Sequence, residues 1–336
     1  MIDLRSDICA APTDAMWDAM RAAHTGWASV GEDEQVALLE RRGAELLGHE
    51  SAAFVPTCTM ANIAALLTLA ARGETIVLEA SAHILTSEAD GVRALAGLEV
   101  VPLASQAGHL GLDAVANVLE RSGGTLLCLE NTHTRAGGTV LDGPETSALA
   151  AAAHACGARV HLDGARLPNA AVALGVPLGA LAAPLDTVSL SLNKGLCAPF
   201  GALLAGSETL IARARIELKR LGGGTVHKAG IAAAAGLVAL DTMVERLAED
   251  HRRARELARL LREQGVRLEP ERVETNIVNI LPAHPAKRAL VLLAERGVLA
   301  LSLDGRRVRL VTHRLIDDGD IQHAAGAIAA VALTAH

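Results

Sequence analysis

Residues 187–201 read TVSLSLNKGLCAPFG, and this stretch decides the fold class. A strand-like run with alternating apolar residues at 187–192 leads into Lys194, and the turn formers Gly195, Pro199 and Gly201 follow closely. An amine at the exit of a buried strand is unfavourable unless it is paired or used. Partial burial lowers the pKa of such an amine, which then becomes the nucleophile for a Schiff base. Taken alone, the pattern also suits a solvated loop lysine.

A second segment, ARVHLDGAR at 158–166, favours the functional interpretation of Lys194. It also has the pattern of a short strand, and it ends in Asp163. The carboxyl ends of neighbouring strands in an α/β sheet face one crevice, so the two side chains are expected to meet there. Together they match the needs of pyridoxal 5'-phosphate, in which a lysine binds the aldehyde and a carboxylate pairs with the ring nitrogen. Alone, Asp163 also suits a turn or a helix N-cap.

Strand-like and helix-like segments alternate along the first two thirds of the chain. This alternation predicts an α/β fold with a mainly parallel sheet. The strands on either side of Lys194 are too close in sequence for a helical crossover, so we expect an antiparallel hairpin. The helix-like segments include 60–71 and 147–155, and the predicted strands are 52–55, 75–80, 98–103, 125–130, 158–163, 187–192 and 201–205.

A long charged helical pattern at 243–265 suggests the link to a smaller C-terminal domain. We therefore expect a large domain at residues 1–242, with the N-terminal segment included, and a small domain at 243–336. Strands are expected in the small domain near 275–281 and 307–311.

Composition excludes several classes of protein. The 336 residues carry a net charge of −7 and are 51% hydrophobic, with no run of 18 apolar residues, so no membrane span is expected. Net acidity without a basic stripe argues against nucleic-acid binding. The five cysteines lack paired spacing, and residues 1–20 lack the apolar region of a signal peptide, which favours a cytoplasmic location. Tyrosine is absent, so a ring stacked on a cofactor is expected to be a histidine.

A phosphate site is expected at 56–62, PTCTMAN, which follows a predicted strand and opens a predicted helix. Free N–H groups at a helix N-terminus bind phosphate, and the hydroxyls of Thr57 and Thr59 add donors. Cys58 contributes its backbone N–H. The alternative is an ordinary threonine N-cap.

With these motifs, the chain resembles the low-specificity L-threonine aldolases, which belong to the β-eliminating-lyase group of fold-type-I pyridoxal-phosphate enzymes. The resemblance implies a seven-stranded sheet and a homodimer or homotetramer with sites at the dimer interface. The matching motifs run in order to about residue 320: MIDLRSD (1–7), FVPTCTMAN (54–62), ENTH (130–133), HLDGAR (161–166), NKGL (193–196), LGGG (221–224) and RLVTH (309–313).

The resemblance also implies roles for individual residues. His83 stacks on the cofactor, His133 lies near the substrate β-hydroxyl, and Lys219 lies near the phosphate. The substrate carboxylate is bound by Ser6, Arg166 and Arg309. Alone, each of these side chains also suits a structural role. His161 shares a strand face with Asp163 and is expected in the core. No histidine or cysteine cluster has metal-ligand spacing, so no catalytic metal is expected.

The implied reaction is retro-aldol cleavage of an L-β-hydroxy-α-amino acid to glycine and an aldehyde. Either histidine could take the hydroxyl proton, directly or through water. Several positions depart from the family pattern, which leaves β-elimination or racemisation on the same cofactor as the alternative. A pyridoxal-phosphate-dependent DNA-binding regulator is disfavoured, because the resemblance begins at residue 1. The departures are Ile8, Val30, Cys58, Asn193, Cys197 and the segment 225–228.

Overall fold

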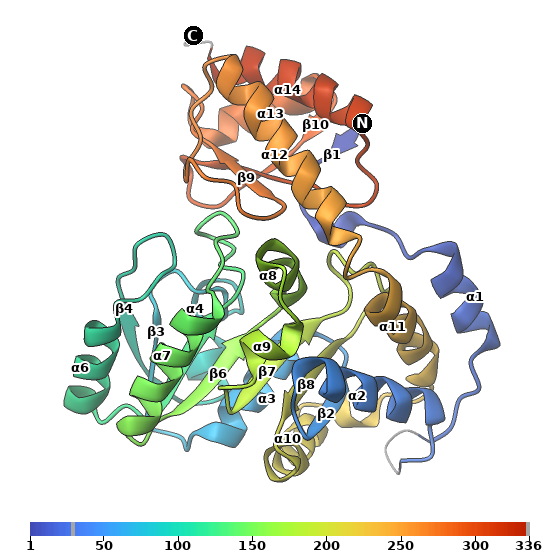
Figure 1. The fold of residues 1–336 in the computed structure, drawn as a ribbon, viewed down its shortest axis with the longest axis vertical. Helices are drawn as coiled ribbons and strands as arrows, with labels where there is room; N and C mark the ends of the chain where they lie inside the picture. Colours follow the sequence, from blue (N-terminus) through green and yellow to red (C-terminus); the bar gives the residue numbers. More distant parts are fainter. Residues whose placement is uncertain (28–30, 334–336) are drawn as a thin grey trace.

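A seven-stranded sheet forms the centre of the large domain in the computed structural model, which describes residues 1–27 and 31–333 (Figure 1). The strand order is β2-β8-β7-β6-β5-β3-β4. All seven predicted strands are confirmed, each within one residue at either end. Their bounds are β2 Ser51–Val55, β3 Thr75–Glu79, β4 Glu99–Leu103, β5 Leu126–Glu130, β6 Arg159–Asp163, β7 Thr187–Ser191 and β8 Ala202–Gly206.

The sheet is parallel except at β8, which runs antiparallel to both β7 and β2. This confirms the hairpin that was predicted around Lys194. In the parallel part, Glu130 at the end of β5 lies opposite Asp163, and Asp163 lies opposite Ser189. The carboxyl ends of these strands therefore bring polar side chains to one edge of the sheet.

Helices cover the sheet and bury its strands, so β5, β7 and β8 are buried along their whole length. The strands consequently read as nearly continuous apolar runs. The helices of this domain are α1 Asp14–Ala22, α2 Glu34–Leu47, α3 Cys58–Leu69, α4 His83–Thr86, α5 Gly91–Ala94, α6 Leu112–Ser122, α7 Gly143–Ala155, α8 Leu167–Leu174, α9 Leu178–Ala182, α10 Glu208–Arg220 and α11 Gly230–Thr242, with 3-10 turns η1 Asp7–Cys9 and η3 Gly223–Thr225.

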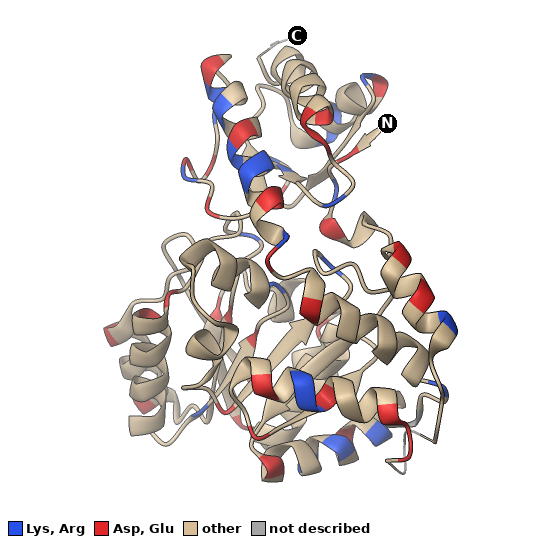
Figure 2. Cartoon of the chain, turned by 45° about the vertical axis from the view of Figure 1, so that its right-hand side comes forward, with Lys and Arg blue, Asp and Glu red and all other residues tan. Residues whose placement is uncertain are grey.

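The C-terminal residues form a separate lobe that begins with the long helix α12 (Figure 1). Acidic and basic residues alternate along this helix (Figure 2). Its elements are α12 Leu247–Glu263, β9 Ile277–Ile280, α13 Ala286–Glu295, β10 Val298–Leu299, β11 Leu301–Ser302, β12 Val308–Val311 and α14 Asp318–Ala332. Three of the strands form a sheet in the order β11-β12-β9.

The N-terminal segment, expected in the large domain, instead joins the core of this small lobe. Strand β1 (Ile2–Asp3) pairs in parallel with β10, and the Leu4 N–H donates to the Leu299 carbonyl over 2.9 Å. Ile2 and Leu4 are buried in the apolar cluster of the lobe. A short strand cannot bury its own apolar side chains, so this segment packs where such a cluster exists. The chain then crosses to the large domain at Ser6.

Val30 lies outside the described residues, so its departure from the family pattern has no structural account. Within the described ranges, no helix has both the length and the apolar character that a membrane span requires.

Candidate active site

A cavity of about 210 Å³ opens where β6 and β7 end, and it collects the central residues that the sequence singled out. Lys194, Asp163 and His83 line it, together with the first turn of α3. The remaining lining residues are Ile8, Asn62, Glu88, Ala165, Ser191 and Asn193.

Lys194 follows β7 in a tight loop. The Cys197 N–H donates to the Lys194 carbonyl, and the Ala198 N–H donates to the Leu192 carbonyl, both over 2.9 Å. Cys197 adopts a left-handed φ of 64°, which lets the chain reverse into β8. Within the described part of the chain, the half-buried Lys194 amine has no hydrogen bond or ion pair. It is thus available for bonding to a ligand.

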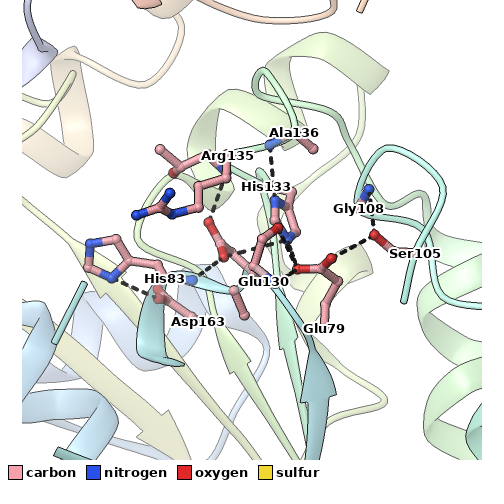
Figure 3. Close-up of polar contacts among 12 residues, drawn as sticks. Glu79, His83, Ser105, Gly108, Glu130, His133, Arg135, Ala136 and Asp163 are labelled. Carbon is pink, nitrogen blue, oxygen red and sulfur yellow. Dashed lines mark hydrogen bonds and ion pairs between the residues drawn. The ribbon is translucent and has the colours of Figure 1, made fainter. Parts of the chain in front are cut away.

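Asp163 presents a buried carboxylate to the same cavity. One oxygen accepts the Ala165 N–H over 3.1 Å, and the other lies 3.8 Å from His83 Nδ1 (Figure 3). A buried carboxylate is costly without a cationic or donating partner, so this oxygen fits a protonated ring nitrogen.

Helix α3 points its N-terminus at the cavity. The Thr57 hydroxyl caps the helix by accepting the Met60 N–H over 3.1 Å, so the N-cap interpretation is correct. The cap leaves the first-turn N–H groups of Cys58 and Thr59 without a helical carbonyl partner, as an anion site requires. Cys58 fits here because its φ is not left-handed. Its thiol lies 3.4 Å from the Ser189 hydroxyl, and burial raises the pKa of Cys58 to about 12.

Arg166 forms a bidentate ion pair with Asp7, a residue that sequence reasoning did not select. Its Nε donates to Asp7 Oδ2 over 2.8 Å and its Nη2 donates to Oδ1 over 2.6 Å. Burial alone would raise the pKa of Asp7, but the charge and hydrogen bonds of Arg166 hold it well below its usual range. Arg166 Nη1 also donates to Thr134. Much of this guanidinium is therefore already engaged before any ligand binds.

Arg309, on β12, is the less satisfied of the two arginines. It is buried, and among the described residues its guanidinium has one hydrogen bond, from Nη2 to the Arg5 carbonyl over 3.1 Å, while its Nε has no partner. Burial, followed by the charge of Arg166, lowers the pKa of Arg309 to about 10. A buried guanidinium with a free donor suits a ligand carboxylate. Ser6 lies at the start of η1, where its hydroxyl accepts the Ile8 N–H and donates to Asp7.

The two candidate histidines differ in their surroundings. The His83 side chain is 32% exposed, and its Nδ1 lies 3.2 Å from Glu88 Oε1. The His133 side chain is 2% exposed and does not line the cavity. His133 Nε2 lies 3.0 Å from Glu79 Oε2, and its Nδ1 accepts the Ala136 N–H over 3.3 Å (Figure 3).

Lys219 lies apart from Lys194, in a second cavity of about 310 Å³. Phe54, Pro56 and Gly223 share that cavity, and Gly223 packs closely against Pro56 and Met60. Within one chain, Lys219 is thus a neighbour of the α3 N-terminus but does not line the Lys194 cavity.

Comparison with known proteins identifies the family of the chain. A family model described as beta-eliminating lyase matches residues 3–283. The chain belongs to the beta-eliminating lyase family. It is 38% identical to the low specificity L-threonine aldolase of Escherichia coli strain K12 over 93% of this chain and 94% of the relative. It is 35% identical to low-specificity L-threonine aldolase 1 of Arabidopsis thaliana over 96% of this chain and 94% of the relative. A threonine aldolase structure from Leishmania major shares the fold, with a TM-score of 0.85, 21% identity and 98% coverage of both chains.

Sequence reasoning missed several polar residues around the site of this beta-eliminating lyase. Each one lies near a motif that was recognised, but at least one of its partners is distant in sequence. Asp7 follows Ser6, Glu130 opens the ENTH motif, and Glu88 lies five residues after His83. The missed residues are Asp7, Asn62, Glu79, Glu88 and Glu130.

His83, Glu88 and Asp163 place possible metal-ligand atoms within 4.8 Å of one another. They also line the cavity where Lys194 and Asp163 meet. The absence of a catalytic metal therefore remains a prediction. His161 is fully buried, as expected, and burial lowers its pKa to about 4.

Proposed function

We propose that this chain is a carbon–carbon lyase that uses pyridoxal 5'-phosphate to cleave L-threonine, L-allo-threonine or a related L-β-hydroxy-α-amino acid to glycine and an aldehyde. The observation that carries the proposal is the meeting of the Lys194 amine and the buried Asp163 carboxylate in one cavity. The names of the aldolase relatives support the choice of reaction within the family.

The residues of the cavity suit this cofactor. Lys194 would bind its aldehyde, Asp163 its ring nitrogen, and the first turn of α3 its phosphate, with His83 against the ring. When bound, pyridoxal phosphate supplies an electron-withdrawing ring conjugated to the substrate nitrogen. Asp163 supports this role because an ionised carboxylate keeps the ring nitrogen protonated. Lys219, in the adjacent cavity, is proposed as an additional phosphate ligand.

Arg309 binds the α-carboxylate in this proposal, with Ser6 and Arg166 beside it. The charges of Arg166, Lys194 and Arg309 all act on Asp7, which supports their closeness. A carboxylate held by a guanidinium fixes rotation about the Cα–N bond of the substrate. Arg309 would in this way select the Cα–Cβ bond for cleavage, using the electron withdrawal that the bound cofactor would supply.

Two proton movements complete the reaction. A histidine, His83 or His133, takes the β-hydroxyl proton, directly or through water, as the Cα–Cβ bond breaks and the aldehyde forms. A proton is then returned to Cα, and glycine leaves. The balance needs no oxidant or reductant. Lys194 would hold the cofactor between turnovers.

We also propose a homodimer or homotetramer in the cytoplasm. Exposed Ile216 and Phe200 lie on the surface, and Ile216 lines the same cavity as Phe54 and Lys219, so a second copy would cover apolar area there. The five cysteines are free, as suits a reducing compartment.

A product assay tests the activity. Purified protein with cofactor is incubated with L-threonine, L-allo-threonine and L-phenylserine, and glycine and aldehyde are quantified. Equal amounts of both are expected, and the Lys194→Ala variant is expected to show no multiple turnover. Pyruvate, ammonia or a D-amino acid in place of glycine would instead support β-elimination or racemisation and reject the aldolase.

A further inference from the structure

Glu88 connects His83 to a buried hydrogen-bond network. It lies between α4 and α5, and its side chain is 1% exposed. One oxygen, Oε1, accepts from two groups: Asn62 Nδ2 over 3.0 Å and His83 Nδ1 over 3.2 Å. This carboxylate lines the same cavity as Lys194.

The Glu88 carboxylate fixes the direction of this network at Asn62. Asn62 Oδ1 accepts the Ser189 hydroxyl over 2.7 Å and lies 3.1 Å from His161 Nε2. Since the Glu88 carboxylate accepts hydrogen bonds, the amide nitrogen of Asn62 faces Glu88 and its oxygen is left for Ser189 and His161. Burial lowers the pKa of His161 to about 4, so its ring is neutral, and the tautomer with the proton on Nε2 satisfies this amide oxygen.

A carboxylate only accepts hydrogen bonds, so the His83 nitrogen that faces Glu88 carries a proton. In the neutral ring, the lone pair then lies on Nε2. Among the residues that the structure describes, His83 Nε2 has no hydrogen-bond partner. His133 contrasts with it, because Glu79 engages one ring nitrogen and the Ala136 N–H engages the other (Figure 3).

We propose that Glu88 is a positioning residue for aldol cleavage, because it holds the proton on His83 Nδ1 and leaves Nε2 to accept the β-hydroxyl proton. This inference rests on the proposed function and deepens it by selecting His83 over His133 as the base.

Burial and the neighbouring charges act on the pKa of His83 in opposite directions. Glu88, Asp163 and Glu130 favour its charged form, whereas Lys194 disfavours it. Burial also opposes protonation, but the carboxylates prevail and the pKa of His83 is raised. The neutral base is thus populated as the pH rises through that pKa, and kcat/KM should rise with it.

The tautomer can be measured without turnover. The full chain with ¹⁵N-labelled histidine is studied by NMR with and without cofactor, and the His83→Asn variant identifies the His83 signals among thirteen histidines. Wild-type protein should show a proton on Nδ1 and a lone pair on Nε2 above the pKa. The opposite tautomer in the wild-type protein would overturn the assignment, even if no Glu88 variant folds.

Kinetics of Glu88→Gln supply the second readout. The amide can donate to Nδ1 and so move the proton to Nε2, which should lower kcat about 100-fold. Loss of the carboxylate should also lower the pKa of His83, so the acidic limb of kcat/KM moves to lower pH. Glu88→Asp keeps the charge and should recover part of kcat. Glu99→Gln, at an exposed carboxylate on β4, is the matched control and should behave as wild type.

A purely structural role would change melting temperature or cofactor affinity but leave the acidic limb and the His83 pKa in place. That result in folded Glu88→Gln would overturn the inference. Wild-type protein that forms no glycine would overturn the proposed function as well. Normal products together with the wrong His83 tautomer would overturn only the role of Glu88.

Discussion

Asp7 and Arg166 form a buried ion pair that joins η1 to the start of α8. The two hydrogen bonds, of 2.8 and 2.6 Å, connect residues 159 positions apart in the chain. The carboxylate is fully buried and the guanidinium almost so. Such a pair is costly to desolvate, and removing one partner leaves an uncompensated charge. The pair consequently holds the N-terminal crossing segment against the edge of the large sheet.

Asp7→Asn should destabilise the fold by about 3–5 kcal/mol, because the Arg166 charge would stay buried without its carboxylate. Urea unfolding at neutral pH measures the change. Asp18→Asn is the control, since Asp18 pairs with Arg21 on the exposed surface of α1 and should change stability by less than about 1 kcal/mol. Equal stability of Asp7→Asn and wild type would show that the pair contributes nothing net.

Thr57→Ala should cost about 1 kcal/mol of stability through loss of the α3 cap and should also weaken cofactor binding. Thr13→Ala removes the corresponding cap of α1, which lies outside the cavity, and should cost the same stability with unchanged cofactor affinity. Thermal unfolding and fluorescence titration with pyridoxal phosphate separate the two effects. Equal cofactor affinity in both variants would argue against a phosphate site at α3.

Arg309→Met should stabilise the fold while it impairs substrate binding. The buried guanidinium has one hydrogen bond and a pKa lowered to about 10, so replacing it with an apolar chain should raise the free energy of unfolding by about 1–3 kcal/mol. Loss of the carboxylate contact should raise KM at least about 10-fold. Denaturant unfolding and steady-state kinetics on one preparation measure both. A destabilised variant with normal KM would contradict this account of Arg309.

Glu79 should make stability depend on pH in the acid range. Burial alone would raise its pKa, but hydrogen bonds from His133, Ser105 and Ser81 lower it to about 2. A carboxylate with a depressed pKa stabilises the fold at pH values above its unfolded pKa of 4.5. That contribution is lost as the pH falls toward the folded pKa of about 2. Glu79→Gln should thus be less stable than wild type near neutral pH, with a gap that narrows below about pH 5. Urea unfolding across this range measures the gap, with exposed Glu120→Gln as the control. A gap independent of pH would contradict the assignment.

The central sheet could be predicted because each strand is a short apolar run that ends in a turn or a polar residue. Lys194 and Asp163 could be predicted to meet for the same reason, since both follow neighbouring strands at one edge. These inferences need only local patterns and the geometry of parallel sheets.

The pairings that complete the site could not be predicted this way. The sequence around Asp7 does not indicate that this carboxylate will pair with Arg166. The sequence around Glu88 likewise does not indicate that it will contact both Asn62 and His83. The strand at Ile2–Asp3 is too short to show a period, and its partner lies almost at the other end of the chain. Such contacts depend on tertiary packing, which the local pattern does not encode.

The N-terminal segment also sets an order for synthesis of the protein. Arg309 donates to the Arg5 carbonyl across 304 positions, and His313 lies 2.8 Å from the Asp3 carbonyl across 310. Residues 3 and 5 thus find these partners only among residues that are synthesised about 300 positions later. The central sheet can form while translation continues, but the arginine pocket cannot close until β12 has emerged. A nascent chain stalled before that strand would leave Ile2 and Leu4 without the core that covers them.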